Sequence, residues 1–229
     1  GFKISHIDKM SSEEILEKVL NLREMEAKQE SVVNELVQEM LDLDTDQFEC
    51  CVNKYISTHG IENTIREIIF PFLQKIGILW QTGNIIPAQE HFVSNIIRQK
   101  LIVAIDQLPN PTNGKKCMLY LPPGEFHELG LLFVCYLLKS RGIRPIYLGA
   151  NVPFEDVKSI THSLKPEMAF MHITSTVQNC NLDKVLQKVQ ENTPGLPTYI
   201  SGQPCSCFER ETPRYIHIKK SFCEVIYFV

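Results

Sequence analysis

The feature that most constrains the fold is a regular alternation of short apolar segments with helical patterns over residues 115–229. The first pair shows the rule: Lys116–Leu121 has the length and hydrophobicity of a buried strand, and the apolar segment after it has the length of a helix. Strands are predicted at 116–121, 144–148, 168–173, 197–201 and 215–218, and helices at 127–140, 154–164, 181–191 and 222–228. This alternation predicts a doubly wound α/β domain with a parallel sheet.

The preceding segment, residues 31–108, has helical periodicity almost throughout. Asp44 or Thr45 is a candidate N-cap, Gly60 is a candidate C-terminal glycine, and Pro87 suits a first helical turn. The apolar stripes are Val33, Leu36, Val37, Met40 and Leu41; Phe48, Cys51, Val52 and Tyr55; Ile65, Ile68, Ile69, Phe72, Leu73, Ile76 and Leu79; and Phe92, Val93, Ile96, Ile97, Leu101, Ala104 and Ile105. Four helices with short connections predict a four-helix bundle, followed by a linker at 109–114. Residues 13–29 are predicted to be a mostly charged helix or linker.

The composition excludes several classes of function. The net charge of −4 does not indicate a basic surface for nucleic acid or anionic membrane. No apolar run reaches the roughly 18 residues of a membrane span, and no signal peptide is apparent. The eight cysteines have no repeated CxxC spacing, which favours reduced thiols and predicts a cytoplasmic protein.

The loop between the first predicted strand and helix carries the first candidate functional residues. His127 lies beyond the carboxyl end of that strand, where open α/β sheets bind ligands. Three interpretations are open: a loop histidine with local hydrogen bonds, a catalytic base, or a metal ligand whose second N–H is donated to Glu125. Gly130 would let the first helical turn approach a bulky ligand. His162, His172 and His217 are predicted to be ordinary core or surface residues.

Three short motifs in order resemble the cobalamin-binding motif of corrinoid domains, written D/E-x-H-x-x-G, S-x-L and G-G. They are Glu125-x-His127-x-x-Gly130, Ser175-x-Val177 and Ser201-Gly202. The resemblance implies that His127 is the lower axial cobalt ligand. It also implies that the displaced nucleotide tail of cobalamin passes the serine and the glycines. Gly149, in the loop after the second strand, is predicted to line the upper corrin face.

A second motif narrows the class. Trp80 is followed after nine residues by Glu90-His91, which resembles the W-x9-EH motif of the light-sensing, cobalamin-dependent MerR-family repressors of the CarH type. The resemblance implies that the bundle (31–108) caps the upper face of adenosylcobalamin, with Trp80, Glu90 and His91 around the adenosyl group. The segment 115–229 is then the Rossmann-like cobalamin-binding domain.

The first ten residues resemble the last helices of a MerR-type DNA-binding domain, so residues 1–30 are interpreted as a remnant of that domain and a linker helix. Two positions depart from the family pattern. Gln81 stands where the light sensors have a histidine that binds cobalt after photolysis, and glutamine is a poor cobalt ligand. Ser201 replaces the first glycine of G-G, and its side chain would narrow the channel for the nucleotide tail.

The resemblance therefore implies a non-enzymatic adenosylcobalamin sensor that controls the association of subunits. A homotetramer in the dark would bind operator DNA through the missing N-terminal domain. One alternative is a corrinoid protein that carries methyl groups between methyltransferases, which has no reason to carry W-x9-EH. The other alternative is a regulator that has lost cobalamin or binds another tetrapyrrole. This alternative stays open because Gln81 and Ser201 depart from the family pattern.

Overall fold

A computed structural model describes residues 12–174 and 182–228. The chain divides into two compact units, Gly1–Ile96 and Ile97–Val229. The predicted DNA-binding remnant at residues 1–10 lies outside the described residues, as do Ser175 and Val177.

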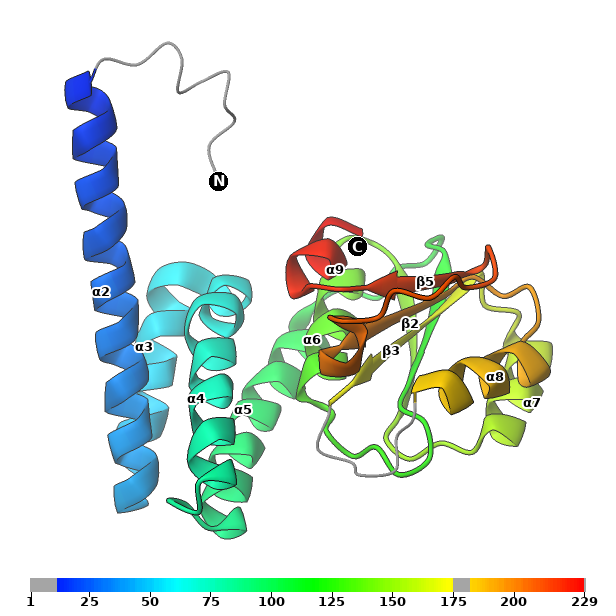
Figure 1. Cartoon of the computed structure of the whole chain (residues 1–229), viewed down its shortest axis with the longest axis horizontal. Helices are drawn as coiled ribbons and strands as arrows, with labels where there is room; N and C mark the ends of the chain where they lie inside the picture. Colours follow the sequence, from blue (N-terminus) through cyan, green and yellow to red (C-terminus); the bar gives the residue numbers. More distant parts are fainter. Residues whose placement is uncertain (1–11, 175–181, 229) are drawn as a thin grey trace. The chain divides into compact units, whose positions relative to one another are not determined.

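The first unit is helical (Figure 1). Its elements are α2 (Ser12–Asp42), α3 (Thr45–Thr64), the π-helical η1 (Ile65–Ile69), α4 (Phe70–Gln81) and the first half of α5 (Pro87–Gln107). Apolar residues from the predicted stripes form its core: Val33, Leu36, Met40, Phe48, Val52, Ile65, Ile68, Ile69, Phe72, Ile76, Val93 and Ile96. Phe48 and Phe72 pack with their ring centroids 5.6 Å apart, which joins α3 to α4.

The helix boundaries follow the predicted signals in part. Asp44 caps α3, since its side chain accepts a hydrogen bond from the Gln47 N–H at 3.0 Å. Gly60 interrupts α3 with a φ of 79° and a ψ of 161°, which a glycine adopts without steric cost. The charged segment 13–29, predicted as helix or linker, is helical and belongs to α2.

The second unit contains a parallel five-stranded sheet with the strand order β2-β1-β3-β4-β5. The strands are β1 (Lys116–Tyr120), β2 (Arg144–Gly149), β3 (Met168–Ile173), β4 (Thr198–Gly202) and β5 (Ile216–Lys219). The helices are α6 (Leu129–Ser140), α7 (Phe154–Leu164), α8 (Leu182–Asn192) and α9 (Phe222–Phe228), with a short 3-10 turn, η2 (Gln203–Cys205), after β4.

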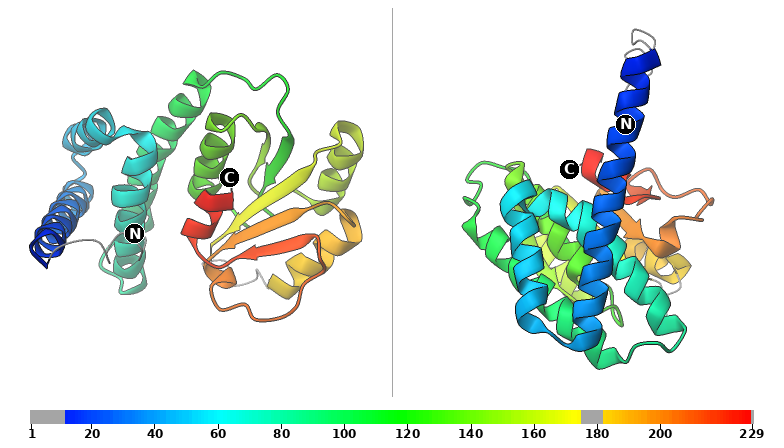
Figure 2. Two further views of the ribbon diagram at one scale, coloured as in Figure 1. Left: turned by 90° about the horizontal axis from the view of Figure 1, so that it is seen from above. Right: turned by 90° about the vertical axis from the view of Figure 1, so that its left-hand side faces the viewer.

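Helices cover both faces of the sheet (Figure 2). On one face, Met118, Tyr120, Met171 and Ile200 pack against α7 and α8 through Val157 and Val189. On the other, Cys117, Leu119 and Phe170 pack against α6 and α9 through Leu131, Val134, Leu138 and Val225. Since alternate strand residues serve opposite faces, strands buried on both sides have the continuous hydrophobicity from which they were predicted.

The predicted fold class is therefore confirmed: a helical region is followed by a doubly wound α/β domain. Among the described residues, no helix combines the length and the hydrophobicity needed to cross a membrane.

Candidate functional site

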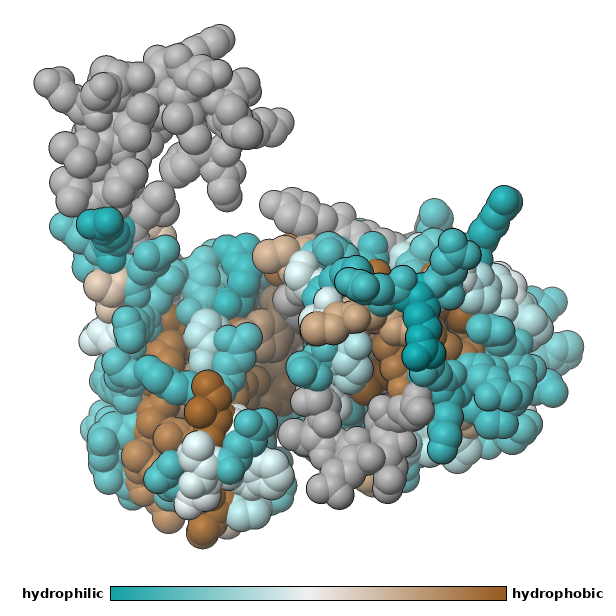
Figure 3. All heavy atoms as spheres, in the orientation of Figure 1, coloured by the Kyte–Doolittle hydropathy of each residue, from teal (hydrophilic) through white to brown (hydrophobic). Residues whose placement is uncertain are grey.

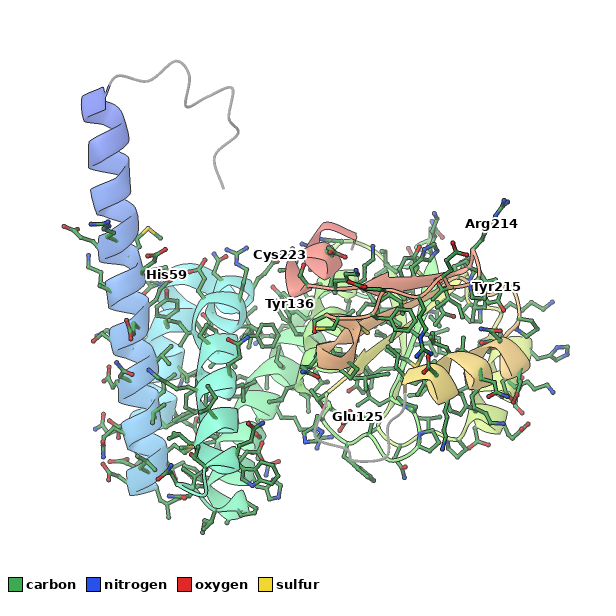
Figure 4. The ribbon with its side chains drawn as sticks, viewed as in Figure 1. His59, Glu125, Tyr136, Arg214, Tyr215 and Cys223 are labelled. Atoms are coloured by element: carbon green, nitrogen blue, oxygen red, sulfur yellow. The ribbon has the colours of Figure 1, made fainter. Side chains whose placement is uncertain are left out.

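The loop that carries His127 leaves the sheet where the strand order reverses. From β1 the chain crosses to β2 on one side and then returns to β3 on the other, so the loops that follow β1 and β3 diverge at this edge. Ligands of open α/β sheets bind at such a switch point. Glu125 lies among these loops (Figure 4).

The buried carboxylate of Glu125 organises the loop. Its Oε1 accepts hydrogen bonds from the backbone N–H groups of Phe126 and His127, each at 3.0 Å. Its Oε2 accepts from the backbone N–H of Thr174 at 2.9 Å and from the Thr174 hydroxyl at 3.0 Å. Burial alone would raise the pKa of Glu125, but the bonds from His127 and Thr174 lower it below its usual value. Glu125 is therefore an anionic acceptor that joins the ends of β1 and β3.

The imidazole of His127 is oriented by the same carboxylate. Its Nδ1 lies 2.6 Å from Glu125 Oε1, as expected if Nδ1 carries the proton and Nε2 the lone pair. The His127 side chain is 48% exposed, and the neighbouring Phe126 is 64% exposed. The loop thus presents an oriented imidazole beside an exposed aromatic ring. A histidine whose second ring nitrogen is hydrogen-bonded to a carboxylate has the orientation typical of a metal ligand.

Gly202 ends β4 in a conformation that excludes other residues. Its φ is +115°, and a Cβ added to it would lie 1.9 Å from the backbone carbonyl oxygen of Ile173. Gly202 and Ile173 are direct partners in the parallel pairing of β4 with β3. The glycine of the predicted motif therefore has a structural requirement, independent of any ligand.

Two further motif residues within the described ranges, Gly130 and Ser201, lie against His172. The Ser201 side chain is buried, and its hydroxyl lies 2.8 Å from His172 Nδ1. A Cβ added to Gly130 would lie 2.3 Å from His172 Cδ2. The close approach expected at Gly130 is thus made by a protein side chain, and Ser201 directs its hydroxyl to the same ring.

The pH dependence of stability should report on His172. Burial lowers the pKa of His172 to about 4, although nearby Glu125 opposes the shift. An unfolded histidine titrates near 6.5, so below that pH the unfolded state binds more protons than the folded state, and stability falls as the pH falls from 6.5 towards 4. Between about pH 6.5 and 5 the loss should be roughly 2 kcal/mol.

Thermal unfolding at both pH values checks this expectation. His172→Asn should lose part of this pH dependence, whereas His162→Gln, at an exposed histidine of α7, should keep it. Equal pH dependence in the wild type and the Asn variant would contradict the neutral state of the partly buried His172.

The residue after His127, Glu128, is held by two other elements. Its Oε2 lies 2.7 Å from Arg98 Nη2 of α5, and its Oε1 accepts a hydrogen bond from the Tyr147 hydroxyl of β2 at 3.0 Å. A Cβ added to Gly149 would lie 3.1 Å from Glu128 Oε1. Gly149, predicted from the sequence to line the ligand, thus leaves room for the Glu128 carboxylate.

The residues predicted to surround the adenosyl group, Trp80, Glu90 and His91, belong to the helical unit. Trp80 is 46% exposed near the end of α4, and Gln81 is exposed beside it. His91 Nδ1 lies 2.8 Å from Glu90 Oε2 in the first turns of α5. Apolar side chains are exposed on this unit, and Figure 3 shows hydrophobic surface there; they include Leu43, Ile78 and Ile86. The helical unit therefore offers an indole, a paired histidine and apolar surface.

Sequence reasoning missed three residues of this arrangement. Thr174, His172 and Glu128 are connected to the loop by contacts between distant parts of the chain, and they carry no local motif. Thr174 precedes the predicted Ser175-x-Val177 motif, which was the only signal near it.

Comparisons with known proteins define the class. Residues 32–104 match the family model described as "B12 binding domain". The fold is similar to that of a Methanosarcina barkeri monomethylamine corrinoid protein, with a TM-score of 0.61 and 14% identity, over 76% of this chain and 85% of that one. The family match supports a cobalamin-binding domain, and the solved structure supports the fold of the chain.

The curated relatives are more specific. The chain is 29% identical to the HTH-type transcriptional repressor CarH of Myxococcus xanthus over 59% of this chain and 46% of that protein. It is 26% identical to the HTH-type transcriptional repressor CarA of the same organism over 58% of this chain and 45% of that protein. The chain thus spans about half the length of these relatives. These matches fit a CarH-type cobalamin-binding region, in agreement with the resemblance found in the motifs.

Proposed function

We propose that the chain is the adenosylcobalamin-binding sensor region of a light-responsive transcriptional repressor and has no enzymatic activity of its own. The observation that carries the proposal is the hydrogen-bonded pair of Glu125 and His127 at the switch point of the sheet. A metal held in a macrocycle already has most of its ligands, so one imidazole oriented by a carboxylate is a suitable ligand from the protein.

Each residue of the loop has a part in this function. His127 would supply Nε2 to the cobalt, and Glu125 would fix the tautomer and make the imidazole a stronger donor by accepting a hydrogen bond from Nδ1–H. Thr174 holds Glu125 in place through two hydrogen bonds. Phe126 offers apolar contact to the corrin ring.

In the proposed sensor, the bound cofactor supplies a cobalt–carbon bond that light can break. Trp80, Glu90 and His91 would surround its upper adenosyl group, with the indole giving apolar cover and the polar pair giving hydrogen bonds. Loss of that group would remove the interactions that bias the protein towards one arrangement of its subunits. By analogy with the HTH-type transcriptional repressors it matches, a protein that contains this region would bind operator DNA. The proposed dark form is a tetramer.

The alternative is a corrinoid carrier in a methyltransferase system, and its support is the fold shared with the monomethylamine corrinoid protein. That likeness concerns the fold alone. The spacing of Trp80 from Glu90-His91 and the similarity to two repressors favour the sensor.

The test is to add adenosylcobalamin to the purified chain in darkness, remove excess ligand, and record the absorption spectrum and elution volume before and after green light. The proposal predicts retained corrinoid, a spectral change on illumination and a changed elution volume. A retained but light-indifferent corrinoid would support the carrier, and no retained corrinoid would exclude both.

A further inference from the structure

Glu128 occupies a position from which a side chain usually serves its own helix. It is the N-cap residue of α6, yet its carboxylate makes no capping hydrogen bond. Both oxygens are instead engaged by other elements: Oε2 by Arg98 of α5 at 2.7 Å and Oε1 by Tyr147 of β2 at 3.0 Å. The Glu128 side chain is 14% exposed, and the hydrogen bond from Tyr147 is partly buried, whereas the Arg98 side chain is 48% exposed.

The surroundings of Glu128 are shaped to receive that carboxylate. Gly149 adopts a φ of +85°, and any Cβ there would crowd Glu128 Oε1 at 3.1 Å. Burial, and then the neighbouring Glu128 carboxylate, raise the pKa of Tyr147, so that its hydroxyl stays protonated and donates. Two other elements, α5 and β2, therefore converge on the residue that directly follows His127.

We propose that Glu128 is a positioning residue for His127, holding the β1–α6 loop against Arg98 and Tyr147 so that the imidazole meets the cobalt in a fixed orientation. This inference rests on the proposed function. Arg98 and Glu128 both lie in the second unit, so their ion pair holds the loop within that unit. The orientation of the imidazole ring matters because the strength of a metal–imidazole bond depends on it.

A contribution to stability alone does not explain the arrangement. Arg98 is 48% exposed, and an ion pair with a half-exposed partner adds little to the free energy of unfolding. Its removal should therefore leave the apo protein folded, while the orientation of the ligand loop becomes less restricted.

The test compares Glu128→Gln and Arg98→Met with Arg66→Met, which removes another half-exposed ion pair, Arg66 with Glu67, in the helical unit. Each protein is labelled with the heavy nitrogen isotope and loaded with cobalt(II) cobalamin. A protein imidazole on cobalt then gives a doublet in the electron paramagnetic resonance spectrum, and the cofactor's own unlabelled base gives a triplet. Corrinoid release into buffer is measured in parallel.

Glu128→Gln and Arg98→Met should release corrinoid about tenfold faster than the wild type and show a smaller doublet fraction, with the melting temperature of the apo protein nearly unchanged. Arg66→Met should match the wild type in both readouts. A wild-type doublet with no change in the two variants would overturn the positioning role and leave the proposed function standing. A wild type that shows no doublet would instead overturn the proposed function.

Discussion

His127→Ala is expected to remove the protein-derived ligand from bound cobalt. The Nε2 lone pair of this half-exposed imidazole is the donor in the proposed complex, and Glu125 has no other ring to orient once it is gone. With protein labelled with the heavy nitrogen isotope and cobalt(II) cobalamin, the doublet of the wild type should disappear. Retention of corrinoid on desalting should fall by at least about tenfold.

The matched control is His162→Ala, at an exposed histidine of α7 in the same unit. It should keep the doublet and the wild-type retention. A doublet that persists in His127→Ala would show that another histidine binds the metal, and His172, next to Ser201, would be the first to test.

The Glu125–His127 contact was predictable because the two residues are two positions apart in one loop, so their proximity follows from sequence. The third member of this network was not predictable. Thr174 reaches Glu125 across 49 positions of sequence, because the pairing of β1 with β3 brings the two loops together. Strand order is set by tertiary packing, and the alternation of strands and helices leaves it open.

Gly130 shows how a motif residue can be recognised while its contact is not. Gly130 was predicted to let a bulky ligand approach the helix. In the structure the ring of His172 lies against Gly130 instead. His172 was predicted to be an ordinary core or surface residue because a single histidine within a strand gives no signal of its own. The contacts of His172 with Gly130 and Ser201 depend on the tertiary packing of β3 beside α6 and β4, which the local sequence does not reveal.

In the helical unit, too, the sequence predicted some elements and left others undetermined. Apolar periodicity located the stripes of α3 and α4, since buried faces repeat every three or four residues. The segment 13–29 is mostly charged, so the sequence predicts either a helix or a linker there, and the structure makes it part of α2. The π-helical turn at Ile65–Ile69 also had no sequence signal, because its apolar residues fit an ordinary helix equally well.

Gly202→Ala is expected to give the largest loss of stability of any single methyl addition considered for the α/β unit. The added Cβ would meet the Ile173 carbonyl oxygen at 1.9 Å and its carbonyl carbon at 2.7 Å. Both are backbone atoms of the paired strand, so neither can rotate away. The cost should be about 3 kcal/mol or more, which lowers the melting temperature by roughly 10 °C in thermal unfolding followed by circular dichroism.

Gly195→Ala separates the steric clash of the added Cβ from the strain of a positive φ, the two contributions to the stability loss at Gly202. Gly195 also has a positive φ, +81°, but a Cβ there would meet nothing within 4 Å. It should therefore show only the backbone penalty, about 1 kcal/mol. If both variants lost the same stability, the end of β4 would relax away from Ile173, and Gly202 would be needed for its φ alone. A clearly larger loss at Gly202 would mean that the tight pairing of β3 with β4 requires glycine before any cofactor binds, so its presence in the motif is not by itself evidence of a ligand.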